Sequence, residues 1–311
     1  IGERLAIASD DAIVFENRLS VDRQKVLKEH VVDGKVMAPG ALYLVMAEGA
    51  ARKGLGVRAL ELCDVAIQAP MVLGEGERSV QTILTRQSSS DWNVRIASKS
   101  DSENGWTIHA LARMQPTVSE RQIRAVPVGD ELDDAIAVDG VYSGLRERGV
   151  ELGAAFRLVR DIRTKGQHRI ASISNPFGQA LHPAVLDACF QSLADCGGKP
   201  AKGTTYLLRG AENVEFFHPL SEDLVCVSRF EAGSGSNGAL FAALELLDED
   251  GLVLVAIKGL CAMPVDTAQR EETDWAYEIA WEELGRSVSG RAGTATGTLV
   301  VSFVRSLSPP E

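Results

Sequence analysis

The chain has 311 residues, of which 45% are hydrophobic and 24% charged, a composition typical of a globular protein with a large core. Its formal net charge of -11 and the lack of any basic run argue against binding to nucleic acid or to an anionic membrane. No apolar stretch approaches the roughly 18 residues that span a bilayer. The five cysteines are scattered without a CxxC pair, which favours buried reduced thiols over a metal site or a disulfide framework.

The N-terminal residues, IGERLAIASDDAIVFENRL, show no basic segment followed by an apolar one, so no signal peptide is predicted. Together with the reduced cysteines, this favours a cytoplasmic location. The sequence does not begin with Met, and we expect it to be a fragment of a longer protein.

A first structural unit is predicted to begin near His30. We expect a helix from Pro39, a residue favoured in the first turn, to Gly54, a residue that favours a helix end. Small and apolar residues recur between them at helical spacing. The strand-like segment ALELCDVAIQAP and an acidic turn come next. They precede three segments with the period-two pattern of antiparallel strands: SVQTILTRQ, DWNVRIAS and WTIHALARMQ.

A second unit repeats this order from His182. A helix is expected to start at Pro183 and to end at Gly197 and Gly198. The predicted strands after it are AENVEFFHPL, LVCVSRFEA, GALFAALELLDEDG and LVLVAIKGLCAMPV. We therefore predict a duplicated α+β protein in which each antiparallel sheet wraps around one long helix rich in small residues.

The repeat predicts where the units begin and end. Residues 1–118 form the first unit, 119–140 a linker rich in Val, Asp and Glu, and 141–265 the second unit. Residues 266–311 change in character: a polar linker precedes DWAYEIAWEEL, which alternates like a strand, and TLVVSFV, which is typical of a strand buried on both faces. We expect this last segment to belong to a different fold.

His30 lies just upstream of the predicted helix start, which Gly34, Pro39 and Gly40 frame. A helix N-terminus presents N–H groups without intrahelical partners and a partial positive charge, which can polarise a carbonyl. A histidine beside such amides is suited to remove the proton α to that carbonyl. The competing interpretation is an ordinary core or surface histidine, which is the commoner outcome for any single His.

Asp187 is expected one turn into the second helix among apolar neighbours, with Gln191 four residues later on the same face. Burial raises the pKa of a carboxyl and would keep it protonated for donation to a leaving hydroxyl. The helix dipole acts in the opposite sense, and the sequence leaves the balance open. The competing interpretation is an aspartate that only stabilises the helix N-terminus.

Both motifs resemble those of the dehydratase domains of modular type I polyketide synthases. His30, Gly34 and Pro39 fit the pattern HxxxGxxxxP, and LHPAVLDACFQ fits the second motif, in which an Asp is followed four residues later by Gln or His. The resemblance covers roughly residues 1–265 and implies a double hot-dog fold. The C-terminal segment is similar to the start of the structural half of a ketoreductase domain.

The resemblance implies dehydration of a β-hydroxyacyl thioester on an acyl carrier protein, a hydro-lyase reaction of polyketide chain elongation. His30 would be the general base and Asp187 the general acid, with Gln191 orienting Asp187. Gly34 and the helix start after Pro39 would hold the thioester carbonyl. No metal or redox cofactor is expected, and the acyl chain would arrive on a phosphopantetheine arm. The expected partners are the carrier protein, the neighbouring acyltransferase and ketoreductase domains, and a second copy of the chain.

One stretch departs from the family pattern. Its members usually carry GYxYGxxF, whereas residues 149–156 read GVELGAAF, with Val150 and Leu152 in place of the tyrosines. Leucine cannot donate a hydrogen bond, so Leu152 is predicted to reshape the substrate pocket. The departure also motivates an alternative, in which double-bond isomerisation or oxa-Michael cyclisation follows dehydration.

Two further alternatives stay open. The domain could be a silent one retained for its dimer contacts, although the intact His30 and Asp187 argue against it. A simple hot-dog thioesterase would leave the paired motifs unexplained. The other histidines, His109, His168, His182 and His218, are not expected to be catalytic, and His182 is expected to be structural.

Overall fold

The strands of the first half wrap around a helix that begins where the sequence predicts. The half comprises β1 (Glu3–Arg4), β2 (Ala12–Leu19), α1 (Gly40–Leu55), β5 (Leu60–Ile67), β6 (Arg78–Arg86), β7 (Trp92–Ser100) and β8 (Thr107–Pro116). Reading outward from β5, the strands are ordered β5-β8-β7-β6-β2. All of these neighbours are antiparallel, as the period-two patterns indicate.

The second half repeats this order. It comprises β9 (Ala135–Ile136), α2 (Val138–Glu147), β11 (Val159–Lys165), β12 (His168–Ser174), α3 (Pro183–Gln191), β13 (Thr204–Phe216), β14 (Asp223–Glu231), β15 (Leu240–Leu247) and β16 (Val253–Asp266). Outward from β13 the strands are ordered β13-β16-β15-β14-β12, the counterpart of the order in the first half. The duplication predicted from the sequence is therefore present in the topology.

The two halves share one sheet because β5 pairs with β13. This antiparallel pair runs from Gly210 opposite Ala66 to Phe216 opposite Leu60 and completes a 13-stranded sheet. A side chain at Gly210 would collide with the backbone carbonyl of Val65, so glycine permits the close approach at this junction.

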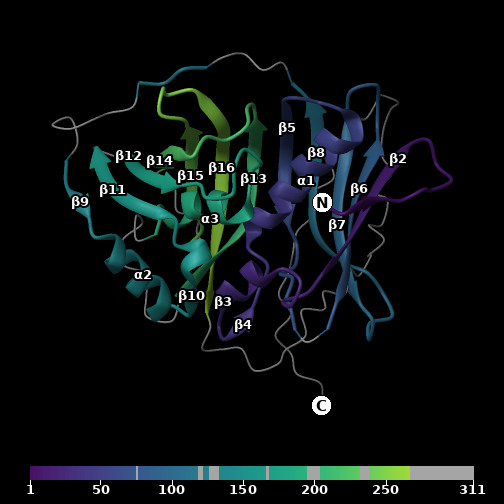
Figure 1. Ribbon diagram of the computed structural model, residues 1–311, viewed down its shortest axis with the longest axis horizontal. Coiled ribbons are helices and arrows are strands. Elements are labelled where there is room, and N and C mark those ends of the chain that lie inside the picture. The colour runs from purple at the N-terminus through teal and green to yellow at the C-terminus, as the bar shows by residue number, and fades with distance from the viewer. Residues whose placement is uncertain are drawn as a thin grey trace, which may run out of the picture. The chain divides into compact units, whose positions relative to one another are not determined.

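The central helices of the two halves, α1 and α3, meet inside the sheet. Figure 1 shows α1 and α3 between the strands of the two halves, and the helices contact each other directly. The two helices contribute mainly small side chains to one core cluster, namely Ala41, Ala47, Ala50 and Ala51 on α1 and Ala184, Ala188 and Cys189 on α3. Small residues allow this close packing, as their abundance in the sequence predicts.

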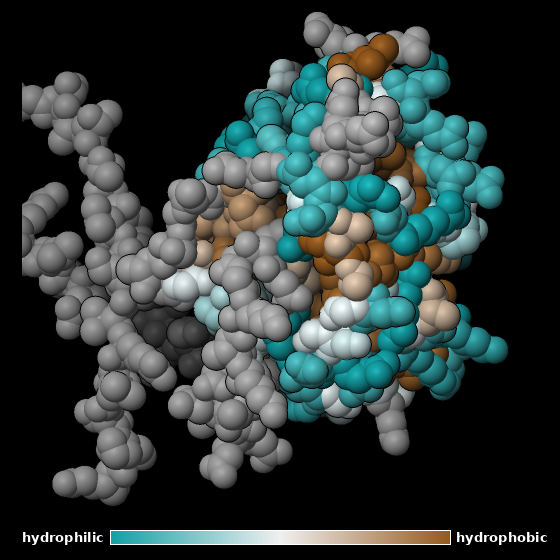
Figure 2. Space-filling view, turned by 90° about the vertical axis from the view of Figure 1, so that its left-hand side faces the viewer, coloured by the Kyte–Doolittle hydropathy of each residue, from teal (hydrophilic) through white to brown (hydrophobic). Residues whose placement is uncertain are grey.

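The computed structural model describes residues 1–74, 76–117, 122–125, 133–165, 168–194, 204–231 and 238–266, all within the compact unit Ile1–Arg270. Of the predicted linker and ketoreductase-like segment, residues 266–311, only Asp266 is described, as the last residue of β16, and the rest lies outside the described residues. Among the described helices, none is long and apolar enough to cross a membrane. Figure 2 shows a largely hydrophilic face on which apolar residues reach the surface in patches.

Both predicted helix ends differ from the structure. Helix α1 continues through Gly54 to Leu55, and Gly56, with a left-handed φ of 69°, ends it. Helix α3 ends at Gln191 rather than at Gly197 and Gly198. The guanidinium of Arg169 donates to the carbonyl of Ser192 at 2.9 Å and also to that of Ala194, which satisfies carbonyls left free by the early helix end.

The predicted linker 119–140 is partly structured. Strand β9 and the first residues of α2 fall inside it, and β9 pairs with β11. Helix α2 was not predicted from the sequence. This helix packs against β10 (Val150–Leu152), a strand of the small sheet that carries His30.

Candidate active site

A small sheet brings residues from both halves together. Strands β3 (His30–Val32) and β4 (Lys35–Val36) form a hairpin, and β10 from the second half pairs with β3. Leu152 lies opposite His30 in this pair. The stretch that departs from the family pattern is therefore directly beside the candidate base.

The imidazole of His30 has a defined orientation. Only 8% of the residue is exposed, and its Nδ1 lies 2.8 Å from the carbonyl oxygen of Met37. A carbonyl can only accept a hydrogen bond, so Nδ1 carries the hydrogen and Nε2 is left to accept a proton. The ring of Phe156 packs against the imidazole, with centroids 5.2 Å apart.

The carboxyl of Asp187 is almost fully buried, with 9% of the residue exposed. Burial raises its pKa above the ordinary value, while the nearby charge of His30 and the hydrogen bond from Gln191 act to lower it. The net shift is upward, so burial decides the balance that the sequence left open. A raised pKa keeps a proton available on Asp187.

Gln191 is hydrogen-bonded to Asp187. Its Nε2 donates to Oδ2 of Asp187 at 2.7 Å and to the carbonyl oxygen of Phe156 at 3.0 Å. The side chain thus connects helix α3 with the 3-10 turn Ala154–Phe156, which follows β10. Phe156 contacts His30 through its ring and Gln191 through its backbone, so it joins the two motifs.

The motifs meet at a cavity of about 260 Å³. Four of the predicted site residues line it: His30, Leu152, Asp187 and Gln191. Much of the remaining lining is apolar, including Val32, Ile67, Leu145, Phe190, Leu208 and Leu260. A largely apolar cavity with a few convergent polar groups is typical of a site for a small organic substrate.

Two predicted site residues lie outside the cavity lining. Gly34 occupies the turn of the β3–β4 hairpin, where Asp33 and Gly34 have φ values of 50° and 71°. These angles require a residue tolerant of the left-handed region, which accounts for the glycine. Pro39 is the N-cap of α1, and its neighbours Ala38 and Gly40 line the cavity instead. At the start of α1 the N–H of Leu42 donates to the carbonyl of Pro39 at 2.9 Å, which leaves the N–H groups of Gly40 and Ala41 without an intrahelical acceptor.

Glu29 is a site residue that the sequence analysis missed. Its backbone carbonyl accepts from the N–H of Gly153 at 2.8 Å, and its carboxylate accepts from the N–H of Ala155 at 2.7 Å. A side chain at Gly153 would collide with the side chain of Glu29. Glycine at this motif position therefore lets Glu29 hold the segment that presents Phe156.

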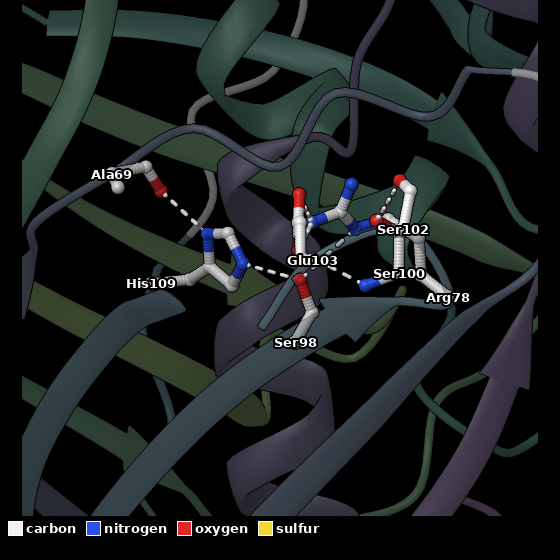
Figure 3. A network of polar contacts seen from close by, with 7 residues as sticks. All are labelled: Ala69, Arg78, Ser98, Ser100, Ser102, Glu103 and His109. Carbon is white, nitrogen blue, oxygen red and sulfur yellow. Dashed lines mark hydrogen bonds and ion pairs between the residues drawn. The ribbon is translucent and has the colours of Figure 1, made fainter. Parts of the chain in front are cut away.

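His109 belongs to a separate polar network, drawn in Figure 3. Its Nδ1 donates to the carbonyl of Ala69 at 3.0 Å, so its Nε2 accepts from the hydroxyl of Ser98 at 2.7 Å. Ser98 accepts in turn from Nε of Arg78 at 3.1 Å, and Arg78 pairs with Glu103. These contacts indicate a structural histidine.

The remaining histidines lie outside the cavity lining. His182 caps α3, because its Nδ1 accepts from the N–H of Ala184 at 3.2 Å, and it stacks on Phe177. His168 is exposed at the start of β12, and His218 follows β13. Among the described residues, no three His, Cys, Asp or Glu side chains form a group that could hold a metal ion.

Two family models match the chain. One, described as polyketide synthase dehydratase domain, matches residues 1–99, which include His30. The other, described as polyketide synthase dehydratase N-terminal domain, matches residues 124–272, which include Asp187. Together they leave only a short central segment of the compact unit unmatched.

The curated relatives are polyketide synthases. Erythronolide synthase EryA2 of Saccharopolyspora erythraea is 29% identical over 258 residues, which cover 79% of this chain and 7% of that protein. Phenolphthiocerol synthesis polyketide synthase type I Pks15/1 of Mycobacterium bovis is 25% identical over 304 residues, which cover 92% of this chain and 14% of that protein. The chain thus spans a small part of these relatives.

Solved dehydratase structures share the fold. The dehydratase domain from the CurJ module of curacin polyketide synthase has a TM-score of 0.77 at 21% identity, covering 85% of this chain and 95% of that one. An isomerase-inactive variant of GphF DH1 has a TM-score of 0.71 at 23% identity, covering 87% and 98%. The predicted α+β double hot-dog fold is confirmed. The chain belongs to the dehydratase domains of modular type I polyketide synthases, the hydro-lyases that remove water during polyketide chain elongation.

Proposed function

We propose that His30 and Asp187 carry out the dehydration as general base and general acid. Nε2 of His30 removes the α-proton of a β-hydroxyacyl thioester, and the electrons of the broken C–H bond form the C=C bond as the β C–O bond breaks. Asp187 donates its proton to the departing hydroxyl, which leaves as water. Transfer of the proton from His30 to Asp187 then restores both groups. The elimination has no redox step, so these two groups supply the proton transfers without a redox cofactor.

The observation that carries this proposal is that one cavity holds a histidine able to accept a proton and a carboxyl able to donate one. The carbonyl of Met37 holds the hydrogen on Nδ1 of His30 and leaves Nε2 free to accept a proton. Burial raises the pKa of Asp187 and keeps it able to donate one. Both residues line the same cavity.

The thioester carbonyl is proposed to bind at the start of α1. Gly40 opens this helix and lines the cavity, so the N–H groups of Gly40 and Ala41, which have no intrahelical acceptor, are the available donors. Negative charge develops on the carbonyl oxygen as the α-proton leaves, and such donors stabilise it. Gly34 contributes indirectly, because its hairpin turn connects β3 with β4.

The substrate is proposed to be an acyl chain on the phosphopantetheine arm of an acyl carrier protein. The apolar lining suits the acyl chain, and Arg148 and Arg209, which also line the cavity, suit the phosphate of the arm. Neighbouring acyltransferase and ketoreductase domains and a second copy of this chain are the further partners that we propose. The solved relatives are described as dehydratase domains of synthase modules.

The test is turnover of β-hydroxyacyl carrier protein by the purified chain and two variants. His30→Phe and Asp187→Asn should each lower the rate at least about 100-fold, because each removes one proton-transfer group. A histidine-to-phenylalanine variant of the CurJ dehydratase and an aspartate-to-asparagine variant of the CurK dehydratase are described as inactive. His168→Phe, at an exposed position of β12, is the matched control and should keep the wild-type rate. Undiminished turnover in either active-site variant would contradict the assigned roles.

The alternative end points are separated by product analysis. Dehydration alone yields the conjugated α,β-enoyl thioester, isomerisation yields a β,γ-enoyl product, and cyclisation yields an oxygen heterocycle. The absence of a hydroxyl at Leu152, opposite His30, is the feature that motivates the two alternatives in which isomerisation or cyclisation follows dehydration. Mass spectrometry and NMR of the products distinguish them. A folded protein that turns over no member of a β-hydroxyacyl series would support the silent-domain alternative, and release of free acid would support a thioesterase.

A further inference from the structure

A tyrosine of α2 reaches the acid of the active site through Gln191. Tyr142 is 8% exposed, and its hydroxyl donates to Oε1 of Gln191 at 3.1 Å. The N–H of Val159 lies 3.4 Å from the same hydroxyl oxygen and donates to it. Tyr142 is not among the described residues that line the cavity, so it acts on the site only through its neighbours.

The donor and acceptor roles in this chain of contacts can run in one direction only. The N–H of Val159 is a donor, so the hydroxyl of Tyr142 must point its own hydrogen at Oε1 of Gln191. Both hydrogens of the Gln191 amide then face acceptors, the carbonyl of Phe156 and Oδ2 of Asp187. The carbonyl oxygen of a protonated carboxyl is a better acceptor than its hydroxyl oxygen, so the hydrogen bond to Oδ2 favours a proton on Oδ1 of Asp187.

We propose that Tyr142 is a positioning residue that determines, through Gln191, which oxygen of Asp187 carries the transferred proton. The proposal deepens the proposed function, because it rests on Asp187 as the general acid. Arg157 supports the arrangement: its guanidinium lies 5.1 Å from the centre of the Tyr142 ring, and its Nε donates to the carbonyl of Leu152 at 2.8 Å. The ring is thereby held against the segment that pairs with the His30 strand.

Removing the hydroxyl has a defined consequence. In Tyr142→Phe, Oε1 of Gln191 loses its donor, and the amide either loosens or turns over. A loosened amide donates less to Asp187, and a turned amide accepts from a protonated carboxyl. Both changes favour the neutral form of Asp187, so the pKa of Asp187 rises whether the amide loosens or turns over. Substrate binding should change little, because Tyr142 itself is not among the described residues that line the cavity.

The first measurement follows Asp187 itself and needs no turnover. The chemical shift of its carboxyl carbon, recorded by ¹³C NMR across a pH series, gives the pH at which the proton is lost. Tyr142→Phe should move this midpoint to higher pH, and Ser143→Ala, which removes an exposed hydroxyl from the next residue of α2, should leave it unchanged. An unchanged midpoint in Tyr142→Phe, with wild-type folding by circular dichroism, would overturn the proposal.

The second measurement uses 3-hydroxybutyryl-pantetheine and 3-hydroxyhexanoyl-pantetheine thioesters with the same chain. We expect kcat to fall roughly ten-fold in Tyr142→Phe, the effect of one buried hydrogen bond, with KM nearly unchanged. Adding Tyr142→Phe to Gln191→Leu should cost no further activity, because Tyr142 acts through Gln191. Fully additive losses would contradict the relay. Wild-type protein without turnover would count against the proposed function, while the NMR midpoint would still decide the role of Tyr142.

Discussion

Leu152 and His30 face each other across the antiparallel pair of β10 and β3, one contributed by each half of the chain. Leu152 is 6% exposed and lines the cavity, so its side chain limits the space beside the imidazole. The residue that departs from the family pattern therefore contacts the region where the α-carbon of the substrate must lie for His30 to act as base.

Changing the size of residue 152 should change which substrates are accepted. Leu152→Ala should raise kcat/KM for α-methyl-branched β-hydroxyacyl thioesters relative to unbranched ones, because the branch can occupy the vacated space. The variant should also lose about 2–5 kcal/mol of stability. Leu247→Ala, at a buried site in a different apolar cluster, should lose comparable stability without changing the ratio of kcat/KM values. An unchanged ratio in Leu152→Ala would show that Leu152 does not select the substrate.

The raised pKa of Asp187 has a consequence for stability. Folded Asp187 keeps a proton that the unfolded chain releases above pH about 4, so the unfolded state binds fewer protons than the folded state. The free energy of unfolding therefore falls as the pH rises from about 4 through the raised pKa of folded Asp187. Asp187→Asn should remove this fall, which approaches about 1.4 kcal/mol per pH unit. Urea unfolding at several pH values measures it.

The same experiment has an exposed control. Asp10→Asn, at an exposed position, should keep the wild-type dependence of stability on pH. If the difference in stability between Asp187→Asn and wild type stays constant across the pH series, Asp187 is not held in its neutral form by burial.

The features that the sequence predicted well are local ones. The spacing of His30 and Pro39 and the helical spacing of Asp187 and Gln191 each lie within a single segment. The structure brings His30, Asp187 and Gln191 to one cavity. The strand patterns likewise predict most of the sheet, because each strand has one buried and one outer face. Duplication followed from the order of these local patterns.

The contacts between segments could not be predicted in this way. The carbonyl of Phe156 that binds Gln191 and the hydroxyl of Tyr142 come from residues distant in the chain. Gly34 illustrates a second limit: its place in the motif suggested an amide for the substrate carbonyl, and its positive φ in the hairpin turn is a separate reason for a glycine at this position. A glycine in a sequence does not distinguish backbone geometry from ligand binding.

Gly153 should prove intolerant of even a methyl group. In Gly153→Ala the new Cβ collides with Glu29, and the collision can be relieved only by moving the turn that carries Phe156. Stability should fall by about 1–3 kcal/mol, and kcat should fall because the Phe156 carbonyl moves away from Gln191. Gly105→Ala, where nothing lies within 4 Å of the added atom, is the control for both readouts. Wild-type kcat in Gly153→Ala would show that the placement of this turn does not matter for catalysis.

The network of Figure 3 should make the fold sensitive to acid. Burial lowers the pKa of His109, and the charge of Arg78 lowers it further, while the Ala69 carbonyl and Glu103 act to raise it. The folded protein therefore keeps His109 neutral at pH values where the unfolded chain takes up a proton, and stability falls as pH drops below about 6.5 toward the lowered folded pKa.

His109→Gln cannot take up this proton, so its stability relative to wild type should improve as the pH falls through that range, although loss of part of the network lowers it at pH 7.5. Urea unfolding between pH 5 and 7.5 tests this, with His168→Gln, an exposed position, as the control. A stability difference between His109→Gln and wild type that does not depend on pH would mean that His109 titrates alike in the folded and unfolded chains.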